Sequence, residues 1–362
     1  MNKIVIICKE LKGEHVSGIH RNTIEILKSL DKFIEKDQVE ILVPSWEDNN
    51  YFFKNINVRS IGKGFKKHGR IRYKTEIYLY KNLYAKNYIR KINAVSVDLL
   101  LLVPQFGCDV ITIYDCIPEL FPEQYSSVGR KITRIKRLKN QRKAVKNAKI
   151  VLTDSENSKL DIQNFYKIES DKIKVIPCGW QHFKDVEEED DVLKRFNLNE
   201  KQFFFSLGNR LPHKNFKWIS CAAKKHPQYK FVISGSSYLN ETHNSGEDAL
   251  KNILFTGRLS DGQVKALMRH CKAFIQPSLY EGFGIPPMEA MSVGADCIVS
   301  NVASLPEVYG NSVWYINPLD YENIDLDKIM SKPKDRNDII LNKYSWDKSA
   351  ELLWEVLKEL AK

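Results

Sequence analysis

The chain has 362 residues, of which 43% are hydrophobic and 28% are charged. This length exceeds what one hydrophobic core commonly supports, so two domains are expected, and the lack of any apolar run of about eighteen residues excludes a predicted membrane span. The 56 lysines and arginines outnumber the 45 aspartates and glutamates and give a net charge of +11, which points to an anionic partner.

Residues 1–8 and the cysteines indicate the cell compartment in which we expect the protein. The apolar run at residues 1–8 is short and lacks a small-residue cleavage site, so it predicts a strand and not a signal peptide. The seven cysteines are scattered and never form a Cys-x-x-Cys pair, which argues against a disulfide framework or a structural zinc. We therefore expect a cytoplasmic protein with most cysteines in its core.

The first half alternates strand-like apolar runs with helical stretches, as βαβ units with a parallel sheet do. Strands are predicted at residues 4–8, 39–43, 99–103, 110–114 and 150–153, and helices at 22–34, 131–146 and 158–166. Gly13 and Gly18 lie in the loop before the first helix. They do not have the Gly-x-Gly-x-x-Gly spacing, which disfavours a dinucleotide-dependent dehydrogenase.

A second series of the same kind predicts a second doubly wound sheet. Its strands are predicted at residues 203–207, 231–235, 253–256, 273–277 and 297–300, and its helices at 216–225, 261–270 and 287–293. The acidic segment 181–191 has no apolar period and predicts a solvated linker. The predicted domains are therefore 1–180 and 192–343, followed by an amphipathic helix at 344–362.

The most informative segment is residues 278–294, with the sequence SLYEGFGIPPMEAMSVG. Gly282 and Gly284 permit positive φ and a close backbone approach, and the two prolines that follow suit the first turn of a helix. Because this turn follows a strand, Glu281 and Glu289 are predicted near the carboxyl edge of a parallel sheet, where ligands bind. The arrangement suits a sugar diphosphate.

A basic loop at residues 206–215 precedes this segment in the second half. Arg210 and Lys214 are four residues apart beside the start of a helix, so both cations can converge on a diphosphate leaving group. The alternative is that Arg210 and Lys214 belong to an ordinary solvated basic turn. Asp325 and Asp327 have the spacing of a manganese site but follow no strand, so we predict capping or solvated residues and no metal.

Together these motifs resemble the retaining family-4 glycosyltransferases of the GT-B fold. Residues 300–308 and 317–320 follow the family pattern as well, so nearly the whole C-terminal half matches. The resemblance implies an α/β protein with two Rossmann-like doubly wound parallel-sheet domains that face a cleft, and a C-terminal helix that crosses back onto the N-terminal domain. The first domain would then bind the acceptor, and the second the nucleotide sugar.

The resemblance also implies roles for individual residues. Glu289 would accept hydrogen bonds from the ribose hydroxyls, and Glu281 would lie near the transferred sugar, while Arg210 and Lys214 hold the diphosphate. The remaining residues implied to bind the donor are Gly18, Asn215, Leu259, Gly282, Phe283, Gly284 and Ile285.

Asp115 follows the predicted strand at 110–114 and is a further candidate. Family members often have His-Asp here, whereas this chain has Tyr114, which leaves no imidazole for the donor sugar. Asp115 either orients an acceptor hydroxyl or caps the following turn, and the sequence favours neither. Glu307 likewise either binds nearby or caps its own turn.

The implied activity is retaining hexosyl transfer from a nucleotide-diphosphate sugar to a lipid-linked glycan, in lipopolysaccharide or capsule synthesis, with no metal or other cofactor. Two alternatives remain open. One is a nucleotide-sugar 2-epimerase of the same fold, and the other is a non-catalytic, glycosyltransferase-like binding subunit.

Basic residues gather in two stretches of the first domain, at 63–91 with interleaved tyrosines and at 131–146. Such stretches favour peripheral contact with an anionic membrane, here the inner face of the plasma membrane. The second-ranked interpretation is that these basic stretches form an ordinary solvated face. Nucleic acid ranks a distant third, because no nucleic-acid motif accompanies the charge.

Overall fold

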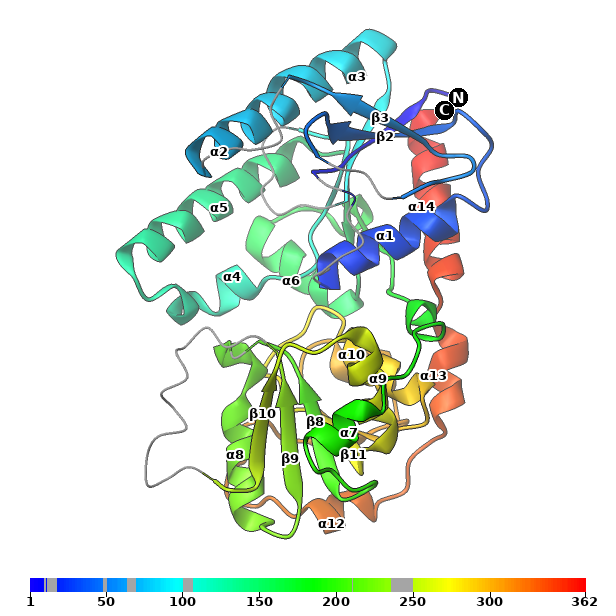
Figure 1. The fold of residues 1–362 in the computed structure, drawn as a ribbon. Helices are drawn as coiled ribbons and strands as arrows, with labels where there is room; N and C mark the ends of the chain where they lie inside the picture. Colours follow the sequence, from blue (N-terminus) through cyan, green and yellow to red (C-terminus); the bar gives the residue numbers. More distant parts are fainter. Residues whose placement is uncertain are drawn as a thin grey trace. The chain divides into compact units, whose positions relative to one another are not determined.

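The computed structural model describes residues 1–9, 11, 18–47, 51–63, 70–99, 107–209, 211–235 and 250–362 (Figure 1). The chain forms two compact units. The first comprises Met1–Gly179 together with Trp346–Lys362, and the second comprises Trp180–Ser345. Among the described residues, no helix is both long and apolar enough to cross a membrane.

The first unit is built on a seven-stranded sheet in the order β3-β2-β1-β4-β5-β6-β7, with every pair parallel. Strands β1 and β2 are buried along their whole length, as expected when helices cover both faces of a parallel sheet. The strands are β1 (Ile4–Ile7), β2 (Val39–Pro44), β3 (Asn57–Ile61), β4 (Val95–Asp98), β5 (Val110–Thr112), β6 (Ile150–Thr153) and β7 (Ile173–Val175).

The helices of the first unit include the last helix of the chain. Helix α14 packs against α1, the backbone N–H of Asn2 donates to the carbonyl of Ala361 at 2.7 Å, and Ser349 Oγ donates to the carbonyl of Pro177 at 2.5 Å. These helices are α1 (Gly18–Leu30), α2 (Arg70–Leu79), the π-helical η1 (Tyr80–Ala85), α3 (Lys86–Ile92), α4 (Ile117–Leu120), η2 (Pro122–Tyr125), α5 (Val128–Asn147), α6 (Glu156–Tyr166), η3 (Ser170–Lys172) and α14 (Trp346–Ala361).

The second unit has a six-stranded, wholly parallel sheet in the order β10-β9-β8-β11-β12-β13. The strands are β8 (Phe203–Leu207), β9 (Lys230–Ser234), β10 (Ile253–Gly257), β11 (Ala273–Gln276), β12 (Cys297–Ser300) and β13 (Trp314–Ile316). The helices are η4 (Gln181–Phe183), α7 (Asp191–Arg195), η5 (Pro212–Lys214), α8 (Phe216–Lys225), α9 (Asp261–His270), α10 (Ile285–Ser292), α11 (Leu305–Tyr309), α12 (Leu326–Met330) and α13 (Asn337–Lys343).

The two predicted parallel sheets are confirmed, but three strands were not predicted: β3, β7 and β13. The strand predicted at 99–103 lies earlier, at Val95–Asp98, and residues 100–106 are outside the described part. Strand β4 escaped the apolar pattern because it buries polar residues: Asp109 accepts hydrogen bonds from both the backbone and the hydroxyl of Ser96, at 2.9 and 2.7 Å.

The predicted solvated linker at residues 181–191 differs from the structure, which packs this segment within the second unit. Phe183 is fully buried, and the Lys265 ammonium donates to the carbonyls of Lys184 and Val186 at 2.9 and 2.7 Å. The segment is held through backbone carbonyls, which an apolar period cannot reveal. The division between the units falls between Gly179 and Trp180.

The cysteines match the sequence prediction. All seven are free, and all except the half-buried Cys221 are buried.

Candidate functional site

The strand order of the second sheet reverses at β8, which pairs with β9 on one side and β11 on the other. In open α/β sheets, ligands bind outside the carboxyl ends of the strands at such a point. The loop after β8 leads through η5 to α8, and the loop after β11 leads to α10 (Figure 1). The two loops touch, because Leu279 N–H donates to the carbonyl of His213 at 2.7 Å.

Glu281 and Lys214 form an ion pair where these loops meet. Lys214 Nζ lies 2.7 and 3.0 Å from the two oxygens of the buried Glu281, and Ser278 Oγ donates to Glu281 Oε1 at 2.5 Å. Burial alone would raise the pKa of the Glu281 carboxyl, but the charge and hydrogen bonds of Lys214 and Ser278 hold this pKa below its ordinary value. Glu281 is therefore ionised at neutral pH.

His213 lies next to this pair and was not predicted as a site residue. Burial and the neighbouring Lys214 charge lower the pKa of His213 to about 4. Its imidazole is therefore neutral at pH 7, and Lys214 is the positive charge of this loop among the described residues.

The glycine turn that follows Glu281 is fixed on both sides. Gly284 has φ +83°, and a Cβ there would lie 2.7 Å from Leu305 Cδ2, so only glycine fits. Ser304 Oγ donates to the carbonyl of Glu281 at 3.0 Å, and the Tyr309 hydroxyl donates to that of Gly284. Two prolines in the first turn of α10 have no N–H, so this turn offers an anion fewer backbone donors than an ordinary helix N-terminus.

Glu289, in α10, is paired with a histidine that sequence reasoning missed. His182 Nε2 and Glu289 Oε1 are 2.8 Å apart, and both side chains are buried. His182 belongs to η4, within the segment predicted as a linker, so no motif marked it. A histidine bound to one carboxylate oxygen holds the group in one orientation.

Asn215 has a structural role in the second unit, and its part in donor binding stays a prediction. Its amide nitrogen donates to the carbonyls of Pro277 and Pro318 at 2.9 and 2.8 Å, and its oxygen accepts from Tyr321 at 3.1 Å. The residue therefore ties the β8 loop to the end of β11.

The other predicted donor-binding residues are placed as follows. Phe283 is buried with its ring against Tyr344, Leu259 lies in the loop between β10 and α9, and Gly18 begins α1 in the first unit. Gly282 and Ile285 flank the turn. Arg210 lies outside the described residues, as does Gly13.

In the first unit, Asp115 follows β5 and accepts a hydrogen bond from the Ile117 N–H at 3.0 Å, which is the capping alternative of the sequence prediction. Tyr114 donates to the carbonyl of Leu99 at 2.9 Å, and burial raises the pKa of its phenol. Tyr114 is therefore a packing residue and does not replace an imidazole.

Three other acidic residues bear on the sequence predictions. Asp325 caps α12 by accepting from Lys328 N–H at 2.9 Å, as predicted, and Asp327 accepts from the Tyr229 hydroxyl at 3.1 Å. The Glu307 side chain is exposed in α11.

Comparison with known proteins agrees with this geometry. Residues 187–346 match the family of glycosyl transferases group 1. The chain is similar to the O-antigen chain mannosyltransferase RfbU of Salmonella typhimurium, with 29% identity over 60% of this chain and 59% of that protein. It is also similar to the O-antigen chain mannosyltransferase B of Escherichia coli, with 26% identity over 62% of this chain and 60% of that protein.

Two further comparisons concern a short segment and the fold. The serotype-specific mannosyltransferase WbdA of Escherichia coli is 48% identical over 22% of this chain but only 10% of its own length. Among solved structures, sucrose-phosphate synthase of Thermosynechococcus elongatus has a TM-score of 0.74 at 16% identity and covers 99% of both chains. The glycosyltransferase WaaG, involved in lipopolysaccharide biosynthesis, has a TM-score of 0.63 at 14% identity and covers 99% of this chain and 98% of its own.

The fold and these likenesses define the class: both units have the parallel α/β architecture of GT-B proteins. Residues 187–346 match the glycosyl transferases group 1 family, and the candidate site lies within this region except for His182. The matched region spans about three fifths of the O-antigen mannosyltransferases, 59% and 60% of their lengths.

Proposed function

We propose that the protein is a glycosyltransferase that moves a sugar from a nucleotide-diphosphate donor to a glycan acceptor in surface polysaccharide synthesis. The observation that supports this most is the Lys214–Glu281 pair at the β8/β11 switch point, beside a glycine turn. An anion that carries hydroxyl groups needs such a combination of a fixed cation, amide donors and a carboxylate acceptor.

The roles of the residues follow from their chemistry. An ammonium group has three donors, and Lys214 directs two of them at Glu281, which leaves the third for a phosphate oxygen. A fixed cation favours departure of the diphosphate, which gains negative charge as the glycosidic bond breaks. Glu281 then accepts from hydroxyls of the transferred sugar, and Glu289, oriented by His182, accepts from the ribose.

We further infer that transfer proceeds with retention and without a metal ion. In this mechanism the acceptor attacks the face that the nucleotide leaves, and the departing phosphate oxygen takes the acceptor proton. Lys214 and the turn amides supply the neutralisation that a metal gives in other transferases. The resemblance to retaining family-4 enzymes supports this proposal.

The acceptor is a lipid-linked glycan in this proposal, and α5 is the surface that fits a membrane. In the 63–91 stretch, Tyr78 is 57% exposed, but Tyr80 is fully buried and donates to the carbonyls of Cys8 and Leu42, at 2.9 and 2.6 Å, and Tyr88 donates to Glu40 at 2.6 Å. Helix α5, in contrast, is exposed along its first half and carries the second basic stretch.

Helix α5 has an exposed apolar stripe as well as charge. Val128, Ile132 and Ile135 are 74%, 48% and 61% exposed, and their spacing of four and three places them on one face. Lysines and arginines surround this stripe. Such a helix can lie in the interface of an anionic bilayer, which supports a cytoplasmic location at the inner face of the plasma membrane.

The proposal is tested by incubating the full chain with UDP-, GDP-, ADP- and dTDP-sugars, with and without a short lipid-linked acceptor. Transfer predicts free nucleoside diphosphate only with acceptor, and an α-linked product from an α-linked donor by NMR. An epimerase would change the sugar without acceptor. A binding subunit would bind a nucleotide but release none, and either result contradicts the proposal.

A further inference from the structure

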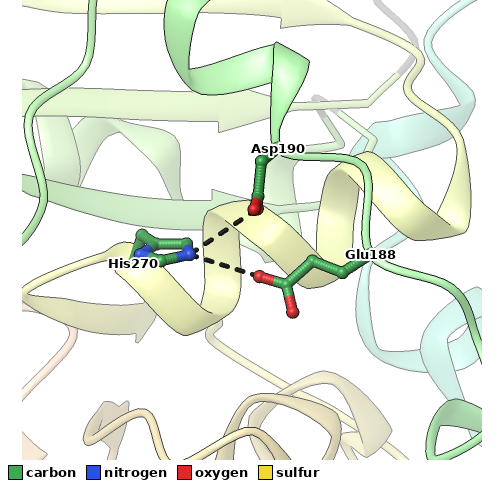
Figure 2. Close-up of side chains that lie close together, drawn as sticks. All are labelled: Glu188, Asp190 and His270. Atoms are coloured by element: carbon green, nitrogen blue, oxygen red, sulfur yellow. Dashed lines mark ion pairs between the residues drawn. The ribbon is translucent and has the colours of Figure 1, made fainter.

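A histidine and two carboxylates that the proposed function does not use lie together in the second unit. His270 is the last residue of α9, and Glu188 and Asp190 belong to the segment before α7 (Figure 2). His270 Nε2 lies 3.2 Å from Glu188 Oε1 and 3.6 Å from Asp190 Oδ1. One potential ligand atom from each residue lies within 4.8 Å of the other two.

The contact between His270 and Glu188 is short but incomplete. Glu188 Oε1 is buried and has no hydrogen-bond partner among the described residues, although the ring nitrogen is near. A buried carboxylate oxygen without a donor is unfavourable. His270 Nε2 and Glu188 Oε1 approach closely but are not aligned for a hydrogen bond. Two groups lie in this way when both bind a third partner.

The spacing of the atoms fits a metal ion as that partner. In a tetrahedral site with metal–ligand bonds of about 2.0–2.1 Å, ligand atoms are about 3.3–3.4 Å apart, and the two distances from His270 Nε2 are 3.2 and 3.6 Å. Calcium requires six to eight oxygens, whereas one imidazole with two carboxylates suits zinc and similar transition metals.

We propose that His270, Glu188 and Asp190 bind one divalent transition-metal ion, with water as a fourth ligand. Asp190 is 65% exposed and Glu188 is 19% exposed, so the site opens to solvent on one side.

Two neighbouring charges hold the ligands in place. Arg269 Nε lies 2.8 Å from Glu188 Oε2, which leaves Oε1 to face the histidine. Glu200 Oε1 lies 3.3 Å from His270 Nδ1, on the side of the ring away from the cluster. Nδ1 has no aligned hydrogen bond among the described residues, and this nearby carboxylate is the group that can accept its proton when Nε2 faces a metal.

The position of the cluster makes the ion structural and not catalytic. His270 lies at the amino end of β11, whereas Glu281 follows the carboxyl end of the same strand, so the two sites are at opposite edges of the sheet. The ion would join the segment before α7 to the end of α9. Lys265, in α9, already donates hydrogen bonds to backbone carbonyls of the same segment.

The test is titration of the EDTA-treated and dialysed full chain with ZnCl₂ by calorimetry and with CoCl₂ by absorption. We expect one equivalent to bind, with the visible bands of four-coordinate cobalt and no thiolate charge-transfer band, and no comparable binding of MgCl₂ or CaCl₂. His270→Gln and Asp190→Asn should each lower zinc affinity about tenfold to a hundredfold.

Glu187→Gln is the matched control, because it removes one charge from the same acidic run at an exposed side chain. This variant should bind zinc like the parent. Asp190→Asn changes an exposed residue, so its metal-free melting temperature should equal that of the parent and loss of binding cannot be attributed to misfolding.

Three results would overturn the proposal: no saturable zinc binding by the parent, equal binding by His270→Gln and the parent, or a cobalt spectrum with sulfur ligation. Transfer activity serves as a separate readout. The metal-free parent should turn over at the rate of the zinc-loaded protein, and a metal-dependent rate that Asp190→Asn preserves would place a different ion at the catalytic edge.

Discussion

The carboxyl edges of the two sheets differ in how they use charge. In the second unit, Glu281 and Glu289 are buried carboxylates, each bound to one basic side chain. In the first unit, Asp115 caps a turn and Tyr114 donates to a carbonyl, while the buried Asp98 at the end of β4 lies 3.9 Å from the Lys81 ammonium. The second unit therefore gathers two paired carboxylates around one glycine turn, whereas the first unit carries an exposed basic helix, α5.

Lys214→Ala should remove the Lys214–Glu281 ion pair and have the largest effect. Loss of a cation at a developing charge lowers turnover by about a hundredfold to a thousandfold. The buried Glu281 then also lacks its counter-charge, which destabilises the fold by about 3–5 kcal/mol. Turnover and the melting temperature should therefore both fall.

A second variant separates these two effects. Lys214→Gln combined with Glu281→Gln restores neutrality, so the melting temperature should recover while turnover does not. Lys224→Ala, an exposed cation on α8, is the control for loss of charge alone. Full activity of the double variant would remove the pair from the proposed mechanism.

Glu289→Gln should weaken binding of the free nucleoside diphosphate by about tenfold to 150-fold, because a hydrogen bond to a charged group contributes about 1.5–3 kcal/mol. Glu281→Gln should instead lower the rate with little change in that affinity, since Glu281 faces the sugar in the proposal. Calorimetry with the nucleotide and steady-state kinetics measure the two quantities. Equal affinity losses in the two variants would refute this division of roles.

His182→Ala should have a smaller effect, about a twofold to twelvefold loss of nucleotide affinity, because it removes one hydrogen bond that orients Glu289. His182→Gln should retain most of the affinity, since its amide can donate to the same oxygen. In a Glu289→Gln background, His182→Ala should add little further loss. Independent losses in the double variant would show that His182 does not act through Glu289.

Substitutions on α5 should leave the chemistry unchanged and alter only membrane binding. Glutamine at Lys131, Arg134, Lys136, Lys139 and Arg142 should reduce sedimentation with anionic vesicles, because each cation near the surface contributes about 1 kcal/mol at low salt. Turnover with a short soluble acceptor should not change.

Binding by the parent should weaken as salt rises, since the attraction acts within about 8–10 Å. Glutamine at Lys86, Arg90 and Lys91 on α3, compared with glutamine at Lys131, Arg134 and Lys136 on α5, is the control matched for charge. If both sets of substitutions reduce sedimentation equally, α5 is not a specific membrane surface.

The sequence predicted the sheets because buried parallel strands are nearly continuous apolar runs, as in β8 and β12. It missed β3, a partly exposed edge strand with the sequence NVRSI. Within the site, the glycine turn and the positions of Lys214 and Glu281 were predictable from local motifs. His182 was not, because it lies 107 positions from its partner Glu289 in a segment without periodicity.

The return of the chain to the first unit has a consequence for the order of folding during synthesis. The second unit is continuous, from Trp180 to Ser345, while the first needs α14, which is made after it. When the ribosome has released residue 345, the second unit is complete, but α1 still lacks the helix that packs against it. The unit that is begun first is therefore finished last, and its apolar α1 face stays uncovered while the second unit is already able to fold.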